Sequence, residues 1–285
     1  MSELIRNSKV QITFALSILI SLFFIVDIYW INIIFKSDNI PMFFLLIVVS
    51  NILMTSVFWA ESGNEIFIRE IAGIKAMEEA VGRATEMGKP VLFVPGILDL
   101  NEVETIAGIN ILGHVAKITA EYETDLNVPV SKSIVMEAAR EICKESYLQV
   151  GRPDLYHNDM VHYLAEDQFA YAAGINGIMI REKPAACIYQ GKFYAESLLL
   201  AETGNRIGAI QIAGTGSSSQ IPFFVTACDY TLIGEEFLTA SAILSGRKDL
   251  LGSVRGQDLV KFFIIISIIL ISIFKILSYW GIYVF

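Results

Sequence analysis

The sequence has little charge and little cysteine, and both shortages exclude classes of protein. Only 18% of its 285 residues are charged and 54% are hydrophobic, with a mean hydropathy of +0.56. A chain this apolar is not intrinsically disordered, and part of it must contact lipid. Its three cysteines, at positions 143, 187 and 228, include no CxxC pair. They therefore predict neither a disulfide framework nor a zinc site, but reduced thiols that face a cytosol.

Positive charge is also scarce. The chain has 21 lysines and arginines against 30 aspartates and glutamates, a formal net charge of −9. A nucleic-acid partner would need a clustered basic face, so we expect none.

Three long apolar stretches predict transmembrane helices, because crossing a bilayer takes ~20 helical residues. They cover residues 10–35, 41–60 and 259–285. The first two would form an N-terminal hairpin within residues 1–60, and residues 61–258 would form a domain between the hairpin and the third span. Tyr29-Trp30-Ile31 does not resemble a signal-peptide cleavage site, so we expect the first span to be retained.

The placement of lysine and arginine predicts the orientation. Arg6 and Lys9 precede the first span, and Lys36 alone lies in the predicted hairpin loop. Basic residues such as Arg69 and Arg247 flank the middle domain. By the positive-inside bias, the N-terminus and the middle domain lie in the cytoplasm, and the protein is a multi-pass protein of the inner (plasma) membrane.

Two charged residues, Asp27 and Lys275, lie within the predicted spans. At ~1.5 Å of rise per residue, each approaches the outer leaflet. In one interpretation Asp27 lies at the interface and Lys275 extends outward to it; in the other, the two form an ion pair that joins the hairpin to the third span. One pair is too few for an ion relay, so we do not expect a transporter.

Residues 61–258 predict an α/β domain, because short apolar strands alternate with helices. We expect strands near residues 91–94, 129–131, 186–189, 209–213 and 229–233. Helices are expected at 158–173 and at 195–203, where Gly204 would stop the second, and Asn101 with Glu104 resembles a capping box that opens another. The fold class is a mostly parallel sheet flanked by helices, Rossmann-like in the loose sense, plus the three transmembrane helices. Small polar linkers are expected at 61–64 and 252–257.

One glycine-rich turn is a candidate ligand site. It follows a predicted strand and precedes a short helix, where backbone N–H groups and hydroxyls can hold an anion. It matches neither GxGxxG nor GxxxxGK[ST], so a plain turn with a serine cap is the alternative. The turn Pro95-Gly96 is expected to line the same crevice. The candidate residues are Gly214, Thr215, Gly216, Ser217, Ser218 and Ser219.

Other polar residues give no complete catalytic or metal-binding set. Asp159, His162 and Glu166 are spaced to share one helix face, as metal ligands can be, but no HExxH motif is present and no cysteine joins them. Cys187 and Cys228 lie in or beside apolar strands, where cysteine is usually a small buried hydrophobe. We predict no metal site, no cofactor and no catalytic residues.

Several segments between residues 69 and 236 carry a resemblance to a known family. They are REIAGIKAMEEAVGRATEMGKPVLFVPG, VPVSKSIVMEAAREICKE, AGINGIMIREKPAACIYQGKFYAESLLLAETGN and IAGTGSSSQIPFFVTACDYTLIGEE. They resemble an uncharacterised family of prokaryotic multi-pass membrane proteins, a domain of unknown function. The resemblance implies a similar membrane topology and supplies no activity or site residue.

Three functional hypotheses remain open. The first is a non-enzymatic membrane protein that presents an acidic domain as a scaffold or subunit, with the bilayer and further copies or other membrane subunits as its partners. Small residues, such as Ala107-Gly108 and Ala172-Ala173-Gly174, would allow close packing within or between copies. The second is a ligand or nucleotide sensor that uses the turn at 214–219. The third is a membrane-tethered hydrolase.

Overall fold

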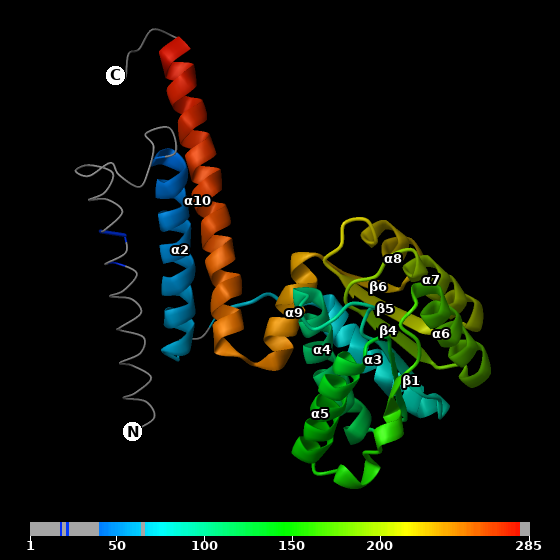
Figure 1. The fold of residues 1–285 in the computed structure, drawn as a ribbon. Helices are drawn as coiled ribbons and strands as arrows, with labels where there is room; N and C mark the ends of the chain where they lie inside the picture. The colour runs from blue at the N-terminus through cyan, green and yellow to red at the C-terminus, as the bar shows by residue number, and fades with distance from the viewer. Residues whose placement is uncertain (1–17, 19–20, 23–39, 64–65, 280–285) are drawn as a thin grey trace, which may run out of the picture. The chain divides into compact units, whose positions relative to one another are not determined.

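The computed structural model describes residues 40–63 and 66–279, together with residues 18, 21 and 22 (Figure 1). It has two compact units. The first combines Met1–Ile68 with Arg247–Phe285, and the second is Arg69–Gly246. The first span predicted at 10–35 and its Asp27 therefore lie almost wholly outside the described residues.

The second unit is built on a six-stranded sheet in which every pair of neighbouring strands is parallel. The strand order is β3-β2-β1-β4-β5-β6, which is the order of the Rossmann fold. The prediction of a mostly parallel sheet is confirmed. The strands are β1 (Val91–Val94), β2 (Leu126–Val130), β3 (Val161–Tyr163), β4 (Ala186–Gln190), β5 (Ile210–Thr215) and β6 (Tyr230–Ile233).

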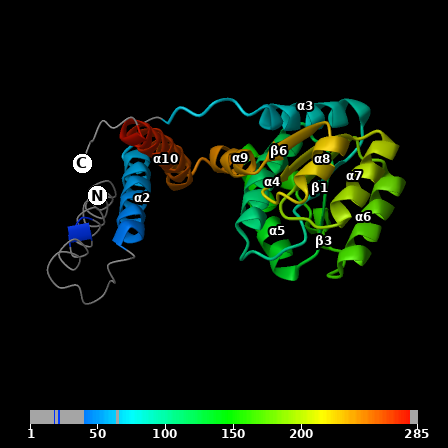
Figure 2. The same cartoon turned by 90° about the horizontal axis from the view of Figure 1, so that it is seen from above.

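Helices cover both faces of the sheet, as the view from above shows (Figure 2). On one face lie α3 (Ala72–Met87), α4 (Val103–Glu121), α5 (Ser133–Val150) and α9 (Glu235–Ser245), whose buried residues share one core cluster. On the other face lie α6 (Gln168–Glu182), α7 (Glu196–Ile207) and α8 (Ile221–Ala227), which share the second. A sheet covered in this way has strands without polar alternation, and every residue of β1 and β4 is buried.

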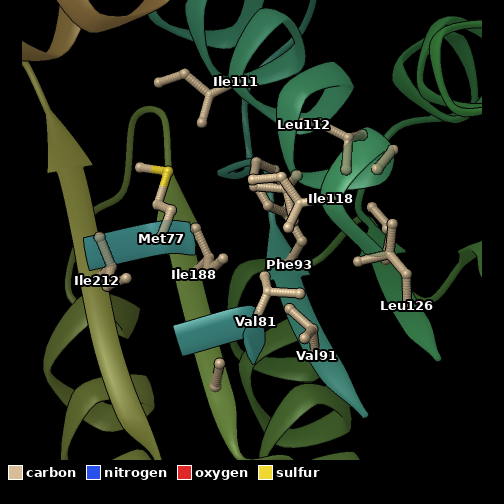
Figure 3. Close-up of a cluster of buried hydrophobic side chains, with 14 of the residues drawn as sticks. Met77, Val81, Val91, Phe93, Ile111, Leu112, Ile118, Leu126, Ile188 and Ile212 are labelled. Carbon is tan, nitrogen blue, oxygen red and sulfur yellow. The ribbon is translucent and has the colours of Figure 1, made fainter. Parts of the chain in front are cut away.

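The larger core cluster lies between the sheet and the first helix layer. Figure 3 shows Met77 of α3 near Ile188 of β4 and Ile212 of β5, and Val81 of the same helix near Val91 of β1. All five are fully buried. Alternate residues of one strand serve the two layers, since Ile188 belongs to this cluster and its neighbour Tyr189 to the other.

Three local expectations were wrong. The helix predicted at 158–173 is a 3-10 turn (Asn158–Met160), then β3, then α6, because Asp167 caps α6 by accepting from the N–H groups of Phe169 and Ala170. Asn101 does not cap α4, whose N-cap residue is Glu102, and no side-chain cap bond forms there. The helix expected to stop at Gly204 continues to Ile207, where Gly208 ends it in the left-handed conformation.

In the first unit, α2 (Ile40–Glu61) packs against α10 (Lys248–Tyr279), and Figure 1 shows them side by side. Two glycines on α10 allow the close approach. A Cβ on Gly252 would lie 2.6 Å from Val57 Cα, and one on Gly256 would lie 3.2 Å from Leu53 Cα. The linker expected at 252–257 is therefore wrong: these residues are helical, and their glycines serve helix packing.

Polar side chains add to this packing. The Arg255 guanidinium lies 3.4 Å from the centroid of the Trp59 ring, a cation–π contact. Asn51 Nδ2 donates to Ser21 Oγ at 2.9 Å, and so ties α2 to the N-terminal segment. An amide hydrogen bond of this kind is a common link between membrane helices.

Within the described residues, one helix rather than three is long and apolar enough to cross a membrane. It is α10, and α2 offers only a shorter apolar stretch, Leu45–Glu61. Most apolar side chains of α10 from Leu259 onward are exposed, and so is Lys275. The prediction of three spans is thus reduced to one candidate span.

Candidate functional site

The parallel sheet brings the carboxyl ends of all six strands to one edge. In open α/β sheets, ligands bind at this edge near the point where the strand order reverses, which here lies between β1 and β4. The segments that follow the central strands are Pro95-Gly96 after β1, Gly191-Lys192 after β4 and Gly216 after β5. They decide which part of the edge can admit a ligand.

Main chain fills the space between the ends of β1 and β4. Ile97 N donates to Lys192 O at 3.1 Å. A Cβ on Gly96 would lie 2.7 Å from Lys192 O, and a Cβ on Gly191 would lie 2.7 Å from Pro95 O. Both glycines have positive φ, 79° and 139°. This packing brings main chain close against both glycines at the place where a Rossmann domain binds a pyrophosphate.

Polar groups instead gather at the ends of β4 and β5. Gln190, the last residue of β4, is fully buried. Its Nε2 donates to Ile212 O at 3.4 Å, whereas its Oε1 has no partner among the described residues. The register pairs Gln190 with Gly214, and a Cβ on Gly214 would overlap Gln190 Oε1. The amide oxygen is thus held against a glycine.

Glu104, in the first turn of α4, approaches the next glycine of the same strand end. A Cβ on Gly216 would lie 2.5 Å from Glu104 Oε1. Glu104 Oε2 is buried and, within the described part of the chain, has no hydrogen-bond partner. One turn later, a Cβ on Gly108 would lie 2.5 Å from Gln190 O. The same face of α4 therefore lies over both strand ends.

The electrostatics of Glu104 are unusual for a glutamate. Burial raises the pKa of its carboxyl group, and the neighbouring Glu102 adds to this, while Lys192 opposes it. Lys192 Nζ lies 3.6 Å from Glu102 Oε2. We call Glu104 and Gln190, with Gly214 and Gly216 beneath them, the acceptor site. It presents two buried oxygens without partners among the described residues, and leaving such a group unpaired costs ~1–3 kcal/mol.

The serine turn is largely bonded to itself. Ser217 N donates to Thr215 Oγ1 at 3.2 Å, and the Ser217 and Ser219 hydroxyls lie 3.1 Å apart. Ser219 Oγ also accepts from Gln220 Nε2 at 3.2 Å. Of the predicted ligand residues, Gly214 and Gly216 are the two that belong to the acceptor site. Ser217, Ser218 and Ser219 follow in the turn, and Thr215 is a buried residue of β5.

Acidic side chains occupy four of the helix starts at this edge. They are Glu104 on α4, Asp167 before α6, Glu196 on α7, and Glu235 with Glu236 on α9. Glu196 is fully buried and accepts from Tyr194 N at 2.8 Å and Gln168 Nε2 at 2.6 Å. Because a helix N-terminus attracts anions, these carboxylates place negative charge at the helix starts where a phosphate would otherwise be favoured.

The other candidates do not form a site. His162 lies in β3 and Glu166 in the loop beyond it, so they do not share a helix face with Asp159. Within the residues that the structure describes, no three histidine, cysteine or acidic side chains could hold a metal ion. Burial raises the pKa of Cys143, Cys187 and Cys228 to about 12, which leaves them inert as nucleophiles at neutral pH.

Sequence reasoning missed the two residues that matter most. The sequence pattern predicts only a capping-box role for Glu104. Gln190 ends the apolar run Ala186–Gln190. A polar residue that ends a buried strand and precedes a glycine was the available signal.

Comparisons with known proteins give a family and no function. A protein-family model described as a domain of unknown function, DUF6754, matches residues 31–283. No curated protein and no solved structure matches the chain.

Proposed function

We propose that the chain, which belongs to the DUF6754 family of unknown function, is a membrane-anchored protein whose α/β domain binds a small molecule at the acceptor site. The observation that carries this proposal is the pair of buried oxygens, Glu104 Oε2 and Gln190 Oε1, that lack partners among the described residues. They lie at the edge of a parallel sheet where ligands bind in this architecture.

Membrane attachment is supported by the exposed apolar surface of α10. We propose an inner-membrane protein with three spans and a cytoplasmic domain, as the sequence predicts. Protease added outside intact cells should then leave residues 69–246 uncut. Digestion of that domain from outside would overturn the orientation.

The binding proposal predicts a site that destabilises the free protein. Glu104→Gln keeps the shape of the side chain and removes a desolvated charge, so the unliganded variant should unfold at a higher temperature than the wild type at pH 7. Glu102→Gln is the matched control, because the Glu102 carboxylate has Lys192 Nζ as an ion partner at 3.6 Å, whereas Glu104 Oε2 is buried without a partner among the described residues. Scanning calorimetry of the full chain in detergent measures both.

Ligand binding itself is tested by a thermal-shift screen of the full chain with nucleosides, nucleotides, sugars and inorganic phosphate. A ligand in large excess over its Kd should raise stability by a few kcal/mol, and Glu104→Gln should remove that shift. The proposal fails if no compound shifts the unfolding and Glu104→Gln also destabilises the protein. In that case the carboxylate has a purely structural role.

A scaffold role is the second candidate, although one reason for expecting it has weakened. Two helix glycines, Gly73 and Gly174, pack inside the domain. A Cβ on Gly73 would lie 2.6 Å from Leu232 Cδ2, and one on Gly174 would lie 2.6 Å from Leu164 Cδ2. They therefore give no argument for contacts between copies.

Exposed apolar side chains favour the scaffold instead. Gln168 donates to Glu196, and Ser197 donates to Gln220 at 2.6 Å, so the first turns of α6, α7 and the start of α8 are tied together. Beside these anchors are three exposed side chains, Phe169 (61%), Leu198 (45%) and Phe223 (38%). We propose a second copy of the chain as their partner. Native mass spectrometry should then find a dimer that Leu198→Ser weakens, and a strict monomer would exclude it.

A further inference from the structure

We infer that the acceptor site recognises the vicinal hydroxyls of a sugar, on a ligand that carries no phosphate there. This inference rests on the proposed binding function and adds the chemical class of the ligand. Its basis is the chemistry of the two unpartnered groups, the charges around them and the packing of the strand ends.

The acceptor site needs a ligand that carries hydrogen-bond donors. An ionised carboxylate can only accept, and an amide oxygen can only accept. Gln190 already uses its amide nitrogen on Ile212 O. Glu104 Oε2 and Gln190 Oε1 are both buried without a partner among the described residues. Because these two side chains lie against glycines only two positions apart in the chain, Gly214 and Gly216, a ligand that satisfies both must carry at least two donors close together.

Negative charge at the start of α4 disfavours a phosphate. Glu104 lies in the first turn of α4, and Glu102 is the residue before that helix. Together they place negative charge where a Rossmann domain places a pyrophosphate. The main chain is also closely packed there, with Gly96 against Lys192 O and Gly191 against Pro95 O.

The positive charge of Lys192 disfavours a cationic ligand. Lys192 Nζ lies 3.6 Å from Glu102 Oε2, and its positive charge partly opposes the rise in the pKa of Glu104 that burial causes. A ligand ammonium group would meet that positive charge beside the carboxylate. A neutral group with two adjacent hydroxyls avoids both repulsions, and its hydroxyls can donate to both acceptors.

Two glycines set the shape of the acceptor site. Gly214 and Gly216 lie beneath Gln190 Oε1 and Glu104 Oε1, and neither has a positive φ. Their backbone conformations therefore do not require glycine, whereas a side chain at either position would displace the acceptor above it. This is the arrangement expected if the two oxygens must be held in fixed positions.

The test compares matched ligands on the full chain in detergent by isothermal titration calorimetry. The probes are the four ribonucleosides, their 2′-deoxy analogues and their 5′-monophosphates. We expect at least one ribonucleoside to bind, with its 2′-deoxy analogue and its 5′-monophosphate at least tenfold weaker. Glu104→Gln and Gly216→Ala should each weaken that ribonucleoside at least tenfold. Glu202→Gln, an exposed position on α7, should leave its Kd unchanged.

Two outcomes overturn the inference. If a monophosphate binds as tightly as its nucleoside, with the same dependence on Glu104, phosphate exclusion is wrong and the proposed binding function survives. If no ribonucleoside binds, recognition of sugar hydroxyls is wrong, and the broader thermal-shift screen decides the binding function separately. Unfolding temperatures of each variant, measured beforehand, show that a loss of binding is not a loss of the fold.

Discussion

Two glycines in helix interiors should respond oppositely to the same substitution. Gly82 lies in α3 and Gly108 in α4, and replacing a helical glycine with alanine normally stabilises by ~1 kcal/mol. A Cβ on Gly82 meets nothing within 4 Å, whereas a Cβ on Gly108 would lie 2.5 Å from Gln190 O and 3.2 Å from its carbonyl carbon. Gly82→Ala should stabilise and Gly108→Ala should destabilise.

The magnitude follows from what must move. The obstacle at Gly108 is main chain at the end of a central strand, so α4 has to shift by nearly an ångström to restore an ordinary contact of about 3.4 Å. Overpacking of this kind costs ~1–3 kcal/mol, which exceeds the helix gain of ~1 kcal/mol. For a domain of this size, each kcal/mol shifts Tm by ~2–4 °C. We expect a net loss of a few degrees for Gly108→Ala and a gain of a few degrees for Gly82→Ala.

Calorimetry of the full chain in detergent measures both shifts, and hydrogen exchange of peptides that cover β1 and β4 assigns them to the domain. Gly108→Ala should speed exchange at the end of β4, where Gln190 lies. Equal stabilisation by both substitutions would refute the close packing of α4 on that strand end, and with it the geometry of the acceptor site.

Three further predictions concern other parts of the molecule. Burial raises the pKa of each cysteine to about 12, so iodoacetamide at pH 8 should modify none of them until urea unfolds the protein. Intact-mass measurement checks this, and a mass increase in the native protein would contradict it. Burial lowers the pKa of His114, so the unfolded state takes up a proton first as pH falls through about 6.5 and stability drops. Denaturant titrations at pH 7 and 5 should show a smaller drop for His114→Gln, and an equal drop would contradict this reason. Gly252→Leu should lower the Tm of the full chain by separating α10 from α2, whereas Gln257→Leu, at an exposed position of the same helix, should not; equal effects would count against the packing.

The sequence was sufficient for the class of fold, because strands buried on both faces read as short apolar runs between helices. The sequence was a poorer guide to where individual helices and strands begin and end. The segment 158–173 carries a helical spacing of polar residues, yet β2 offers an unpaired edge that Val161–Tyr163 completes as a parallel strand. Edge pairing depends on residues more than thirty positions away and is not visible in local spacing.

The candidate site was only partly predictable, for a similar reason. Gly214 and Gly216 were recognised as a glycine-rich turn, but their role depends on what lies above them. Gln190 comes from the neighbouring strand and Glu104 from a helix a hundred residues earlier in the chain. Which side chain opposes a glycine is a property of strand order and helix placement, and no spacing rule within one segment contains it.

The close contact between α2 and α10 has a consequence for the architecture of the gene product. Gly252, near the start of α10, lies against Val57 and Ala60, near the end of α2. The chain thus leaves this helical pair and returns to it at neighbouring points, which is the geometry of a domain inserted into a parent protein. Residues 69–246 should be replaceable by a short glycine-serine connector with the two helices still paired, as a disulfide between cysteines introduced at positions 57 and 252 would report.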